Sequence, residues 1–434
     1  MKRRKFIKNS ALGMVGAGVL ASDTIRKEKE NKQDKGPKIK EYRTLGRTGF
    51  KVSDISAGLP GNEAILNRLL DAGVNYIDSA EYYSQGFYER MTGNVIKNRN
   101  RKSLFITTKL ALKGKESKES IIQRTRKCLE RLQTDYLDCM MISSAETVQM
   151  LKYPAFHEAM KQLKNEGRVR FVGVSNHGSS FPGMGQKRES MEKILVTAAR
   201  DGRFDILLLV YNFLTKEASE KILKVCAEKN IGTTLMKVNP VGDYHNVSSM
   251  IKQMEAGGKP VPKFYQVIQK KFKEEADRMM AHLKKEEFKD PAKIREAAIR
   301  FVLSNPGVHA VLCACNTFDQ VESFIKLSGM PLTATDKSTL ADYEKDFGRL
   351  YCRHACGLCE YKCPHQVPVN TIMRFNHYFT AQGREKHAMN EYSQLEGNRA
   401  DVCSNCSGDC ESACPYKVPI QPLLILAHQN LHFA

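Results

Sequence analysis

The sequence predicts an α/β protein: a parallel (β/α)8 TIM barrel followed by a small helical, ferredoxin-like iron–sulfur domain. Three observations lead to this prediction. Short apolar strands alternate with amphipathic helices over about 300 residues, and eight such repeats fit a closed barrel better than an open sheet. Eight of the thirteen cysteines fall between residues 352 and 414. The chain has 434 residues, which allows two to three domains.

The eight predicted strands are short apolar runs with helical patterns between them. They cover residues 55–59, 75–79, 104–110, 135–143, 170–175, 204–211, 231–238 and 309–314. The clearest helical patterns are residues 119–133 and 155–168. Residues 240–290 are too long for a simple connection, so we expect a helical excursion at the barrel mouth.

The composition is that of a soluble globular protein, with 41% hydrophobic and 27% charged residues. No apolar run reaches the eighteen or so residues of a membrane span. The formal net charge is +20, and removing residues 1–21, with their five basic side chains, lowers it to +15. Two clusters bound by thiolates would lower it further, to about +11. The remaining Lys and Arg alternate with Glu, as in residues 270–290, which predicts a solvated helix face and no nucleic-acid partner.

The N-terminus has the layout of an export signal. Arg3 and Arg4 precede the apolar Phe6, a Gly- and Ala-rich stretch follows over residues 11–21, and small residues end it. This order of charge, apolar run and cleavage site predicts a twin-arginine signal peptide, and the alternative is a basic disordered tail. The charged residues 22–40 are expected to form a flexible linker.

The predicted export signal, residues 1–21, is compatible with a chain that has thirteen cysteines. The twin-arginine machinery exports folded proteins, so cysteines that bound iron in the cytosol would reach the periplasm with their thiolates occupied. We therefore expect a periplasmic protein that uses the twin-arginine machinery as an export partner.

The C-terminal cysteines form two groups, each ending in Cys-Pro: Cys352, Cys356, Cys359 and Cys363, then Cys403, Cys406, Cys410 and Cys414. The phrases CPHQVPV and CPYKVPI that close them indicate an internal duplication. Such spacing places thiolates around a cubane, and the Cys-Pro turn lets the last cysteine reach the other cluster. The sequence predicts two [4Fe-4S] clusters held by these eight cysteines.

Two other interpretations of the cysteines explain less of the pattern. A zinc site would need two Cys-x2-Cys knuckles without the repeated Cys-Pro ending, and disulfides would need no such spacing. Residues 346–434 resemble the helical dicluster ferredoxin domain, although x3 replaces the usual x2 after Cys352 and Cys406, so the assignment of ligands to each cluster stays open. The other five cysteines, in apolar contexts, are expected to be core residues.

Five segments of the predicted barrel carry family motifs: residues 45–58, 75–93, 106–110, 167–176 and 299–308. Through them, residues 41–345 resemble the aldo-keto reductase family. The resemblance implies a barrel enzyme that interconverts a carbonyl and an alcohol.

The resemblance also implies a catalytic set at the carboxyl ends of the strands. Tyr83 would donate the proton, Lys109 would lower the pKa of its phenol, and Asp78 would hold the lysine. The family histidine is missing, since Ser143 occupies its position. His177, at the predicted barrel mouth, could contribute.

The nucleotide-binding pattern is mixed. Ser175 and Asn176 match the pair that holds a nicotinamide carboxamide in the family, but Leu208 stands where a glutamine is usual. Residues 313–323 lack the basic residue that would bind a 2′-phosphate. NAD(P) is therefore an open expectation beside the two clusters.

Three functions follow. The first is an oxidoreductase that couples a small carbonyl or alcohol substrate in the barrel to electron transfer through the clusters, with a redox partner protein. The second is an NAD(P)-dependent carbonyl reductase with structural clusters. The third is an electron carrier with an inactive barrel, which should not respond to Tyr83→Phe.

Overall fold

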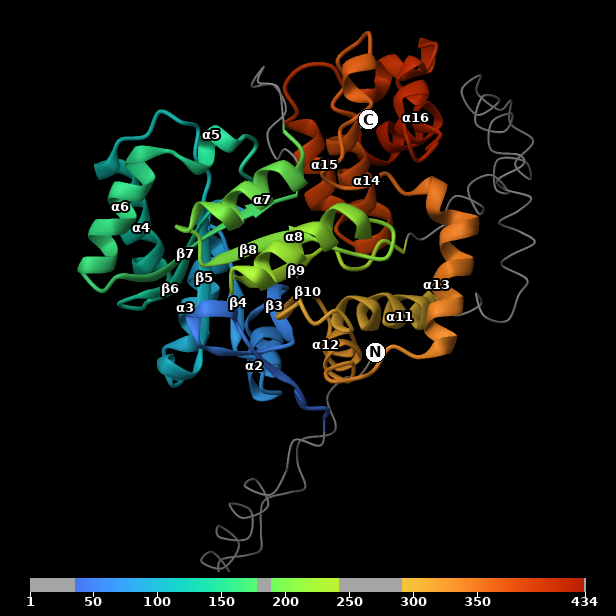
Figure 1. Cartoon of the computed structure of the whole chain (residues 1–434). Coiled ribbons are helices and arrows are strands. Elements are labelled where there is room, and N and C mark those ends of the chain that lie inside the picture. The colour runs from blue at the N-terminus through green and yellow to red at the C-terminus, as the bar shows by residue number, and fades with distance from the viewer. Residues whose placement is uncertain (1–35, 178–188, 242–290, 433–434) are drawn as a thin grey trace, which may run out of the picture. The chain divides into compact units, whose positions relative to one another are not determined.

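The computed structural model describes residues 36–177, 189–241 and 291–432. Eight parallel strands close into a barrel in the order β10-β3-β4-β5-β6-β7-β8-β9 (Figure 1). All eight predicted strands are confirmed, with ends within two residues of those expected. They are β3 Ile55–Pro60, β4 Tyr76–Asp78, β5 Phe105–Leu110, β6 Leu137–Ile142, β7 Val169–Asn176, β8 Ile206–Val210, β9 Gly232–Met236 and β10 Ala310–Cys315.

Amphipathic helices cover the outside of the barrel. Side chains that accept a backbone N–H from the first turn begin several of them, for example Asn62 before α2, Ser117 before α4 and Ser190 before α7. The helices are α2 Glu63–Asp71, α3 Phe87–Ile96, α4 Lys118–Leu132, α5 Val148–Leu151, α6 Pro154–Asn165, α7 Met191–Asp201, α8 Lys216–Glu228, α11 Pro291–Leu303 and α12 Phe318–Ile325. The excursion expected over residues 240–290 lies almost wholly outside the described residues.

Side chains fill the inside of the barrel, and one end is closed by a hairpin of β1 (Tyr42–Thr44) and β2 (Lys51–Ser53). Leu45 and Val52 of this hairpin segment are fully buried among residues that the strands point inward, which are Tyr76, Phe105, Cys139, Met141, Ile206, Leu208 and Ala310. Because the interior is packed, chemistry is confined to the strand ends, and in a barrel of this kind that means the carboxyl ends.

Two residues fix α3, the helix that follows the predicted catalytic tyrosine. Glu89 is fully buried and accepts hydrogen bonds from Thr108 Oγ1 at 2.6 Å and from Arg131 Nε at 2.5 Å. A Cβ at Gly93 would lie 2.6 Å from Arg131 O, so only glycine allows α3 to approach α4 this closely. This packing fixes the start of α3 and, with it, Tyr83.

The C-terminal segment packs onto the barrel through a shared core. Phe213 and Leu214 after β8, and Ile294 and Ala297 of α11, are buried in one cluster with the C-terminal helices. In Figure 1 helices α14, α15 and α16 lie together in orange and red. The elements are α13 Ala334–Phe347, η5 Gly348–Leu350, η6 Glu360–Lys362, α14 Val369–Gln382, α15 Glu385–Ser393, η7 Ala400–Asn405, η8 Asp409–Ala413 and α16 Ile420–Leu431.

The internal duplication is also present in the backbone, with an offset of 51 residues (Cys352 to Cys403). At this offset η6 corresponds to η8 and α14 to α16. Gln366 and Lys417, which are equivalent, both adopt left-handed backbone angles, with φ of 52° and 53°. The two Cys-Pro segments therefore turn in the same way before each helix.

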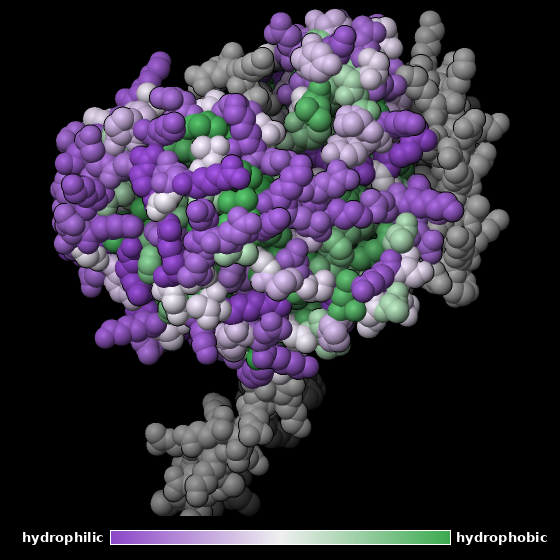
Figure 2. Space-filling view, viewed as in Figure 1, coloured by the Kyte–Doolittle hydropathy of each residue, from purple (hydrophilic) through white to green (hydrophobic). Residues whose placement is uncertain are grey.

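Hydrophilic residues cover most of the visible face of the molecule (Figure 2). Within the described residues, no helix combines the length and the hydropathy that a membrane crossing requires.

Candidate active site and metal centre

An ion pair lies at the carboxyl ends of β4 and β5. Lys109 Nζ donates to Asp78 Oδ2 at 2.6 Å and to Ser79 O at 2.5 Å. Both charged side chains are buried, with 5% of Asp78 and 2% of Lys109 exposed. Burial raises the pKa of Asp78, and the ammonium of Lys109 opposes that rise. The structure thus joins the two residues that the sequence assigned as anchor and lysine.

Tyr83 begins η2 (Tyr83–Gly86), just after β4. The Lys109 Nζ lies 5.2 Å from the centre of its ring. Burial, followed by the charge of Asp78, raises the pKa of Tyr83 instead of lowering it as expected. Burial is the largest cause of the rise, and the ammonium of Lys109 donates its hydrogen bonds to Asp78 and Ser79 instead of to the phenol. Ser84 and Gln85 hold left-handed angles, with φ of 45° and 55°, which is costly for residues with a Cβ.

Ser143, at the position of the family histidine, lies directly after β6. Its Oγ is 2.8 Å from the hydroxyl of Tyr82, the neighbour of Tyr83 in the chain. Burial raises the pKa of Tyr82. A hydroxyl pair therefore occupies the place where the family motif has an imidazole, and this partner of Ser143 was not predicted.

The two residues assigned to nicotinamide binding end β7. Ser175 Oγ accepts from Ser144 N at 2.9 Å, and Asn176 Nδ2 donates to Ala145 O at 2.5 Å. Both side chains are buried, and both are hydrogen-bonded to the segment that follows β6. Leu208 is buried inside the barrel, where it offers no hydrogen bond.

His177 connects the barrel to the C-terminal segment. Its Nε2 lies 3.1 Å from Ser144 Oγ, and Arg374 Nη1 of α14 lies 3.2 Å from its Nδ1 and 3.4 Å from its carbonyl oxygen. Burial, with the charges of Arg374 and Lys237, holds the pKa of His177 well below its usual range. These conditions favour the neutral imidazole, and its hydrogen-bond contacts are with Ser144 after β6 and Arg374 of α14.

A second tyrosine–lysine contact lies at the same end of the barrel and was not predicted. Lys237, which follows β9 directly and has φ of 56°, donates from Nζ to the Tyr378 hydroxyl of α14. Burial alone would raise the pKa of Tyr378, but Lys237, Arg374 and Arg384 lower it to about 8. Lys237 lies near the end of the predicted strand 231–238, and that position close to a strand end was a usable signal. No signal pointed to Tyr378, because only tertiary packing brings α14 to the barrel.

Aromatic side chains link the first cysteine group to the strand ends. Tyr351, next to Cys352, hydrogen-bonds to His354 Nδ1, and Asn212 Nδ2, after β8, donates to the Tyr351 hydroxyl at 3.5 Å. The rings of His354 and His377 have centres 5.4 Å apart. In the described part of the chain, His354 Nε2 is buried and has no hydrogen-bond partner.

All thirteen cysteines lie within the described residues, and none forms a disulfide there. Burial is the largest cause that raises the pKa of Cys352, and the thiols of Cys356 and Cys414 raise it further. For Cys403, the thiol of Cys363 is the largest cause after burial. The last cysteine of each group is therefore close to the other group. By these influences, Cys352, Cys356, Cys359 and Cys414 form one neighbourhood, and Cys363, Cys403, Cys406 and Cys410 form the other. The two adjoin, because Cys410 of the second also raises the pKa of Cys359 in the first.

Several of these sulfur atoms accept hydrogen bonds. Backbone N–H groups donate to Cys363 and Cys414 at 3.4 Å and to Cys406 at 3.5 Å, and Asn370 Nδ2 lies 3.4 Å from Cys352 Sγ. Such bonds stabilise thiolates and tune cluster potentials. In residues 36–177, 189–241 and 291–432, no three His, Cys, Asp or Glu side chains are arranged around a single metal ion.

The remaining five cysteines are buried core residues, as expected, and burial is the first cause that raises the pKa of each thiol. They are Cys128, Cys139, Cys226, Cys313 and Cys315.

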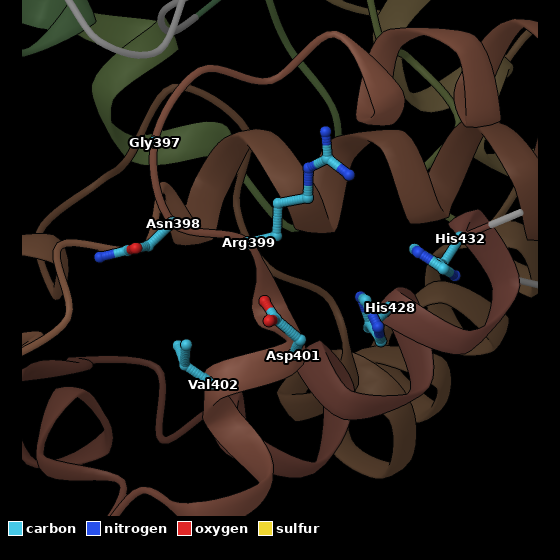
Figure 3. A pocket seen from close by; sticks show the side chains of 7 residues that line it. All are labelled: Gly397, Asn398, Arg399, Asp401, Val402, His428 and His432. Carbon is cyan, nitrogen blue, oxygen red and sulfur yellow. The ribbon is translucent and has the colours of Figure 1, made fainter. Parts of the chain in front are cut away.

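A cavity of about 290 Å³ lies beside the second cysteine group, between η7 and α16. His428 and His432 line one side, and Arg399 and Asp401 lie across from them (Figure 3). Tyr392 closes this region by a hydrogen bond of 2.7 Å to His428 Nδ1. None of the residues that line this cavity belongs to the Asp78–Lys109 site at the strand ends.

A closed parallel barrel with an aspartate, a lysine and tyrosines at the carboxyl ends of its strands defines the class of barrel oxidoreductases. The model of the Aldo/keto reductase family matches residues 60–344, and the chain belongs to this family, whose members are oxidoreductases.

Curated relatives match over the same region. Aldo-keto reductase YhdN of Bacillus subtilis (strain 168) is 24% identical over 322 residues, covering 69% of this chain and 92% of the relative. L-galactose dehydrogenase of Arabidopsis thaliana is 25% identical over 329 residues, covering 70% and 93%. Among solved structures, an aldo-keto reductase from Bacillus halodurans (holo form) matches with a TM-score of 0.49 and 22% identity, covering 70% of this chain and 95% of that one.

Proposed function

We propose that the barrel binds a small carbonyl or alcohol substrate and that the C-terminal segment holds two [4Fe-4S] clusters, which exchange electrons with a partner protein. One observation carries the proposal. Eight unpaired thiols, in two neighbourhoods, share a compact unit with the Asp78–Lys109 site of an aldo/keto reductase barrel.

The residues of the C-terminal segment fit the proposed clusters. Each neighbourhood offers four cysteines, three from one repeat and the last from the other, which is the exchange found in two-cluster ferredoxins. The N–H groups that point at Cys363, Cys406 and Cys414 would stabilise bound thiolates. When bound, such clusters supply one-electron transfer.

In the barrel, the chain's own residues would bind and orient the oxygen of the substrate. Lys109, fixed by Asp78, presents a positive charge beside the ring of Tyr83. The hydroxyl pair of Tyr82 and Ser143 offers a neutral hydrogen-bond donor in place of the family histidine.

The first cysteine neighbourhood is the one adjacent to the barrel. Tyr351 directly precedes Cys352 in the chain, and the ring centres of Tyr351 and His377 are 5.7 Å apart. Arg374 of the same helix as His377 contacts His177 at the barrel mouth. We infer that the cluster of Cys352, Cys356, Cys359 and Cys414 is proximal to the substrate and that the other cluster faces the partner.

The experiment is anaerobic purification of the full chain, followed by iron, sulfide, zinc and nucleotide analysis. We expect brown protein with about eight iron atoms per chain, as two four-iron clusters require. A panel of aldehydes, ketones and alcohols is then added, and the visible absorption of the clusters is followed. An oxidisable substrate should bleach it, and a reducible one should restore the colour of dithionite-reduced protein.

Lys109→Met provides the matched variant for that experiment. It should keep its iron and lose the response to substrate. Colourless, iron-free protein from anaerobic cells would contradict the proposal, and so would an unchanged response in the Lys109 variant. Tyr83→Phe separates an enzyme from an electron carrier, because a carrier would not respond to that change.

A nicotinamide-dependent carbonyl reductase is the second candidate, and the positions of Ser175 and Asn176 at the end of β7 favour it. The fit is partial, because Leu208 replaces a hydrogen-bonding residue. When bound, a nicotinamide nucleotide donates or accepts a hydride. Fluorescence titration with NADH and NADPH tests this candidate: binding that Asn176→Ala abolishes would support it.

Export by the twin-arginine route to the periplasm is part of the proposal, with residues 1–21 as the signal and 22–40 as the linker. The barrel would extend over residues 41–345 and the iron–sulfur domain over 346–434. Replacing Arg3 and Arg4 by lysine should leave the protein in the cytoplasm in a cell-fractionation assay. Unchanged periplasmic recovery would contradict this part.

A further inference from the structure

We propose that Tyr378, held by Lys237, is a second proton-transferring residue of the barrel site and that the C-terminal segment supplies it. The inference rests on the proposed function, because it assigns a role in the same carbonyl–alcohol reaction. It makes the C-terminal segment a part of the active site as well as an electron carrier.

The contact between the two residues is direct. Lys237 Nζ donates to the Tyr378 hydroxyl and lies 4.4 Å from the centre of its ring. Lys237 follows β9 at the carboxyl end of the barrel, where active sites of this fold lie. Lys237 has a left-handed backbone, with φ of 56°, which is uncommon for a residue with a long side chain. Such strained conformations are typical of functional sites.

Other groups around Tyr378 come from each element packed against it. Arg374 lies on the same helix, and the guanidinium of Arg384 lies 5.1 Å from the Tyr378 ring centre. From α15, the ring of His387 lies 6.0 Å away, and Glu391 interacts with both arginines.

The charge around the phenol is therefore mainly positive. Burial alone would raise the pKa of Tyr378, but Lys237 and the two arginines lower it to about 8. Only 8% of the residue is exposed, so water does not screen these charges well. A phenol with this pKa can both donate and accept a proton near neutral pH.

Tyr83 and Tyr378 are close enough to influence each other electrostatically, but they differ in their surroundings. Tyr378 is among the groups that raise the pKa of Tyr83 electrostatically. Lys109 donates its hydrogen bonds to Asp78 and Ser79, whereas Lys237 donates to the phenol itself. The lysine that the family motif assigns to the tyrosine is thus engaged elsewhere, and Lys237 makes the equivalent contact.

The proposed step is one proton transfer. Reduction of a carbonyl to an alcohol consumes two electrons and two protons, so that one hydrogen ends on carbon and one on oxygen. The reductant of the proposed function supplies the electrons; with the clusters the proton for carbon comes from solvent, and with a nicotinamide the hydrogen for carbon arrives as hydride together with both electrons. The O–H bond of Tyr378 breaks as an O–H bond forms on the substrate oxygen, and the phenolate stays paired with the Lys237 ammonium. Solvent then returns the proton. Alcohol oxidation runs the same transfer backwards.

The first test is a titration that needs no substrate. The ultraviolet difference spectrum between wild-type holoprotein and Tyr378→Phe cancels the absorption of the clusters and isolates one phenol. We expect a tyrosinate step with a midpoint near pH 8. Lys237→Met should raise that midpoint by about 1 to 3 pH units, because it removes the nearest opposite charge.

Two further variants serve as the control and as a second test of the titration. Tyr42→Phe removes a tyrosine of β1, at the other end of the barrel, and should leave the step near pH 8 in place. Arg384→Gln removes a more distant charge and should raise the midpoint less than Lys237→Met, which provides a measurement if the lysine variant does not fold. A step near pH 8 that persists in Tyr378→Phe would overturn the assignment.

The second test is turnover of 4-nitrobenzaldehyde with reduced viologen dye or NADPH as the electron source. Tyr378→Phe should lower kcat by about 10²- to 10⁴-fold, the usual contribution of a general acid, and should remove the pH dependence near pH 8. Wild-type turnover with an unchanged pH profile would overturn the role. Absence of turnover in the wild-type protein would count against the proposed function, while the titration would still decide whether the phenol is activated.

Discussion

The hydroxyl of Ser143 lies 2.8 Å from the hydroxyl of Tyr82, so the residue that replaces the family histidine is bound to the neighbour of the expected catalytic tyrosine. This contact explains how the barrel accommodates the missing imidazole: two hydroxyl groups satisfy each other at the end of β6 without leaving a polar group unpaired.

We predict that Ser143 and Tyr82 are energetically coupled. Ser143→Ala and Tyr82→Phe should each lower the free energy of unfolding by about 0.5–1.5 kcal/mol, the net value of a hydrogen bond. The double variant should lose less than the sum, because either change removes the same bond. Urea unfolding of the four proteins measures the coupling, and strictly additive losses would contradict it.

We predict that Lys109→Met destabilises the protein by about 3–5 kcal/mol, because it leaves Asp78 charged and unpaired in a buried site. Burial already raises the pKa of Asp78, and without the ammonium that pKa should rise further. Asp78→Asn in the same chain removes the buried charge and should recover most of the loss. Thermal unfolding at pH 7 measures both variants, and a double variant no more stable than Lys109→Met would show that the buried charge is not the cause.

We predict that His309 makes the barrel sensitive to acid. Burial, then Arg43, lowers the pKa of His309 to about 4, and Thr233 N lies 3.1 Å from its Nδ1. Between pH 6.5 and 4 the unfolded chain binds a proton that the folded chain does not, so stability falls as pH falls. The full loss is about 3 kcal/mol, because the pKa falls from 6.5 to about 4 and a difference of one in pKa is worth about 1.4 kcal/mol.

Unfolding free energies measured from pH 7 to pH 4.5 test this. His309→Asn keeps an acceptor for Thr233 N and removes the titration, so its slope against pH should be flatter than that of the wild type by about 1 kcal/mol per pH unit. Equal slopes would exclude His309 as the acid-sensitive group.

We predict that the last cysteine of each group serves the other cluster. Cys363→Ser should therefore alter the same electron paramagnetic resonance signal as Cys403→Ser, and Cys414→Ser the same signal as Cys352→Ser. Cys226→Ser, a buried change in α8, is the control and should alter neither signal. Pairing of the effects within each sequence group would contradict the exchange.

How far the sequence predicts the structure differs between parts of the chain. The eight strands were predictable because each parallel strand is a continuous apolar run that local periodicity reveals. The family resemblance implied the pairing of Asp78 with Lys109, and the structure joins them at 2.6 Å because β4 and β5 are neighbouring strands. The lowered pKa expected for Tyr83 was not found, because burial and the charge of Asp78 raise it.

The sequence by itself determined the barrel, the two cysteine repeats and the loss of the family histidine. Each of these depends on the order and spacing of residues that are near one another in the chain. Only the tertiary structure decided that α14 packs at the barrel mouth, where Arg374 contacts His177 and Tyr378 contacts Lys237. Those pairs are 197 and 141 residues apart in the chain. The apolar core that α11 shares with the C-terminal helices brings these residue pairs together. No local sequence pattern predicts that core.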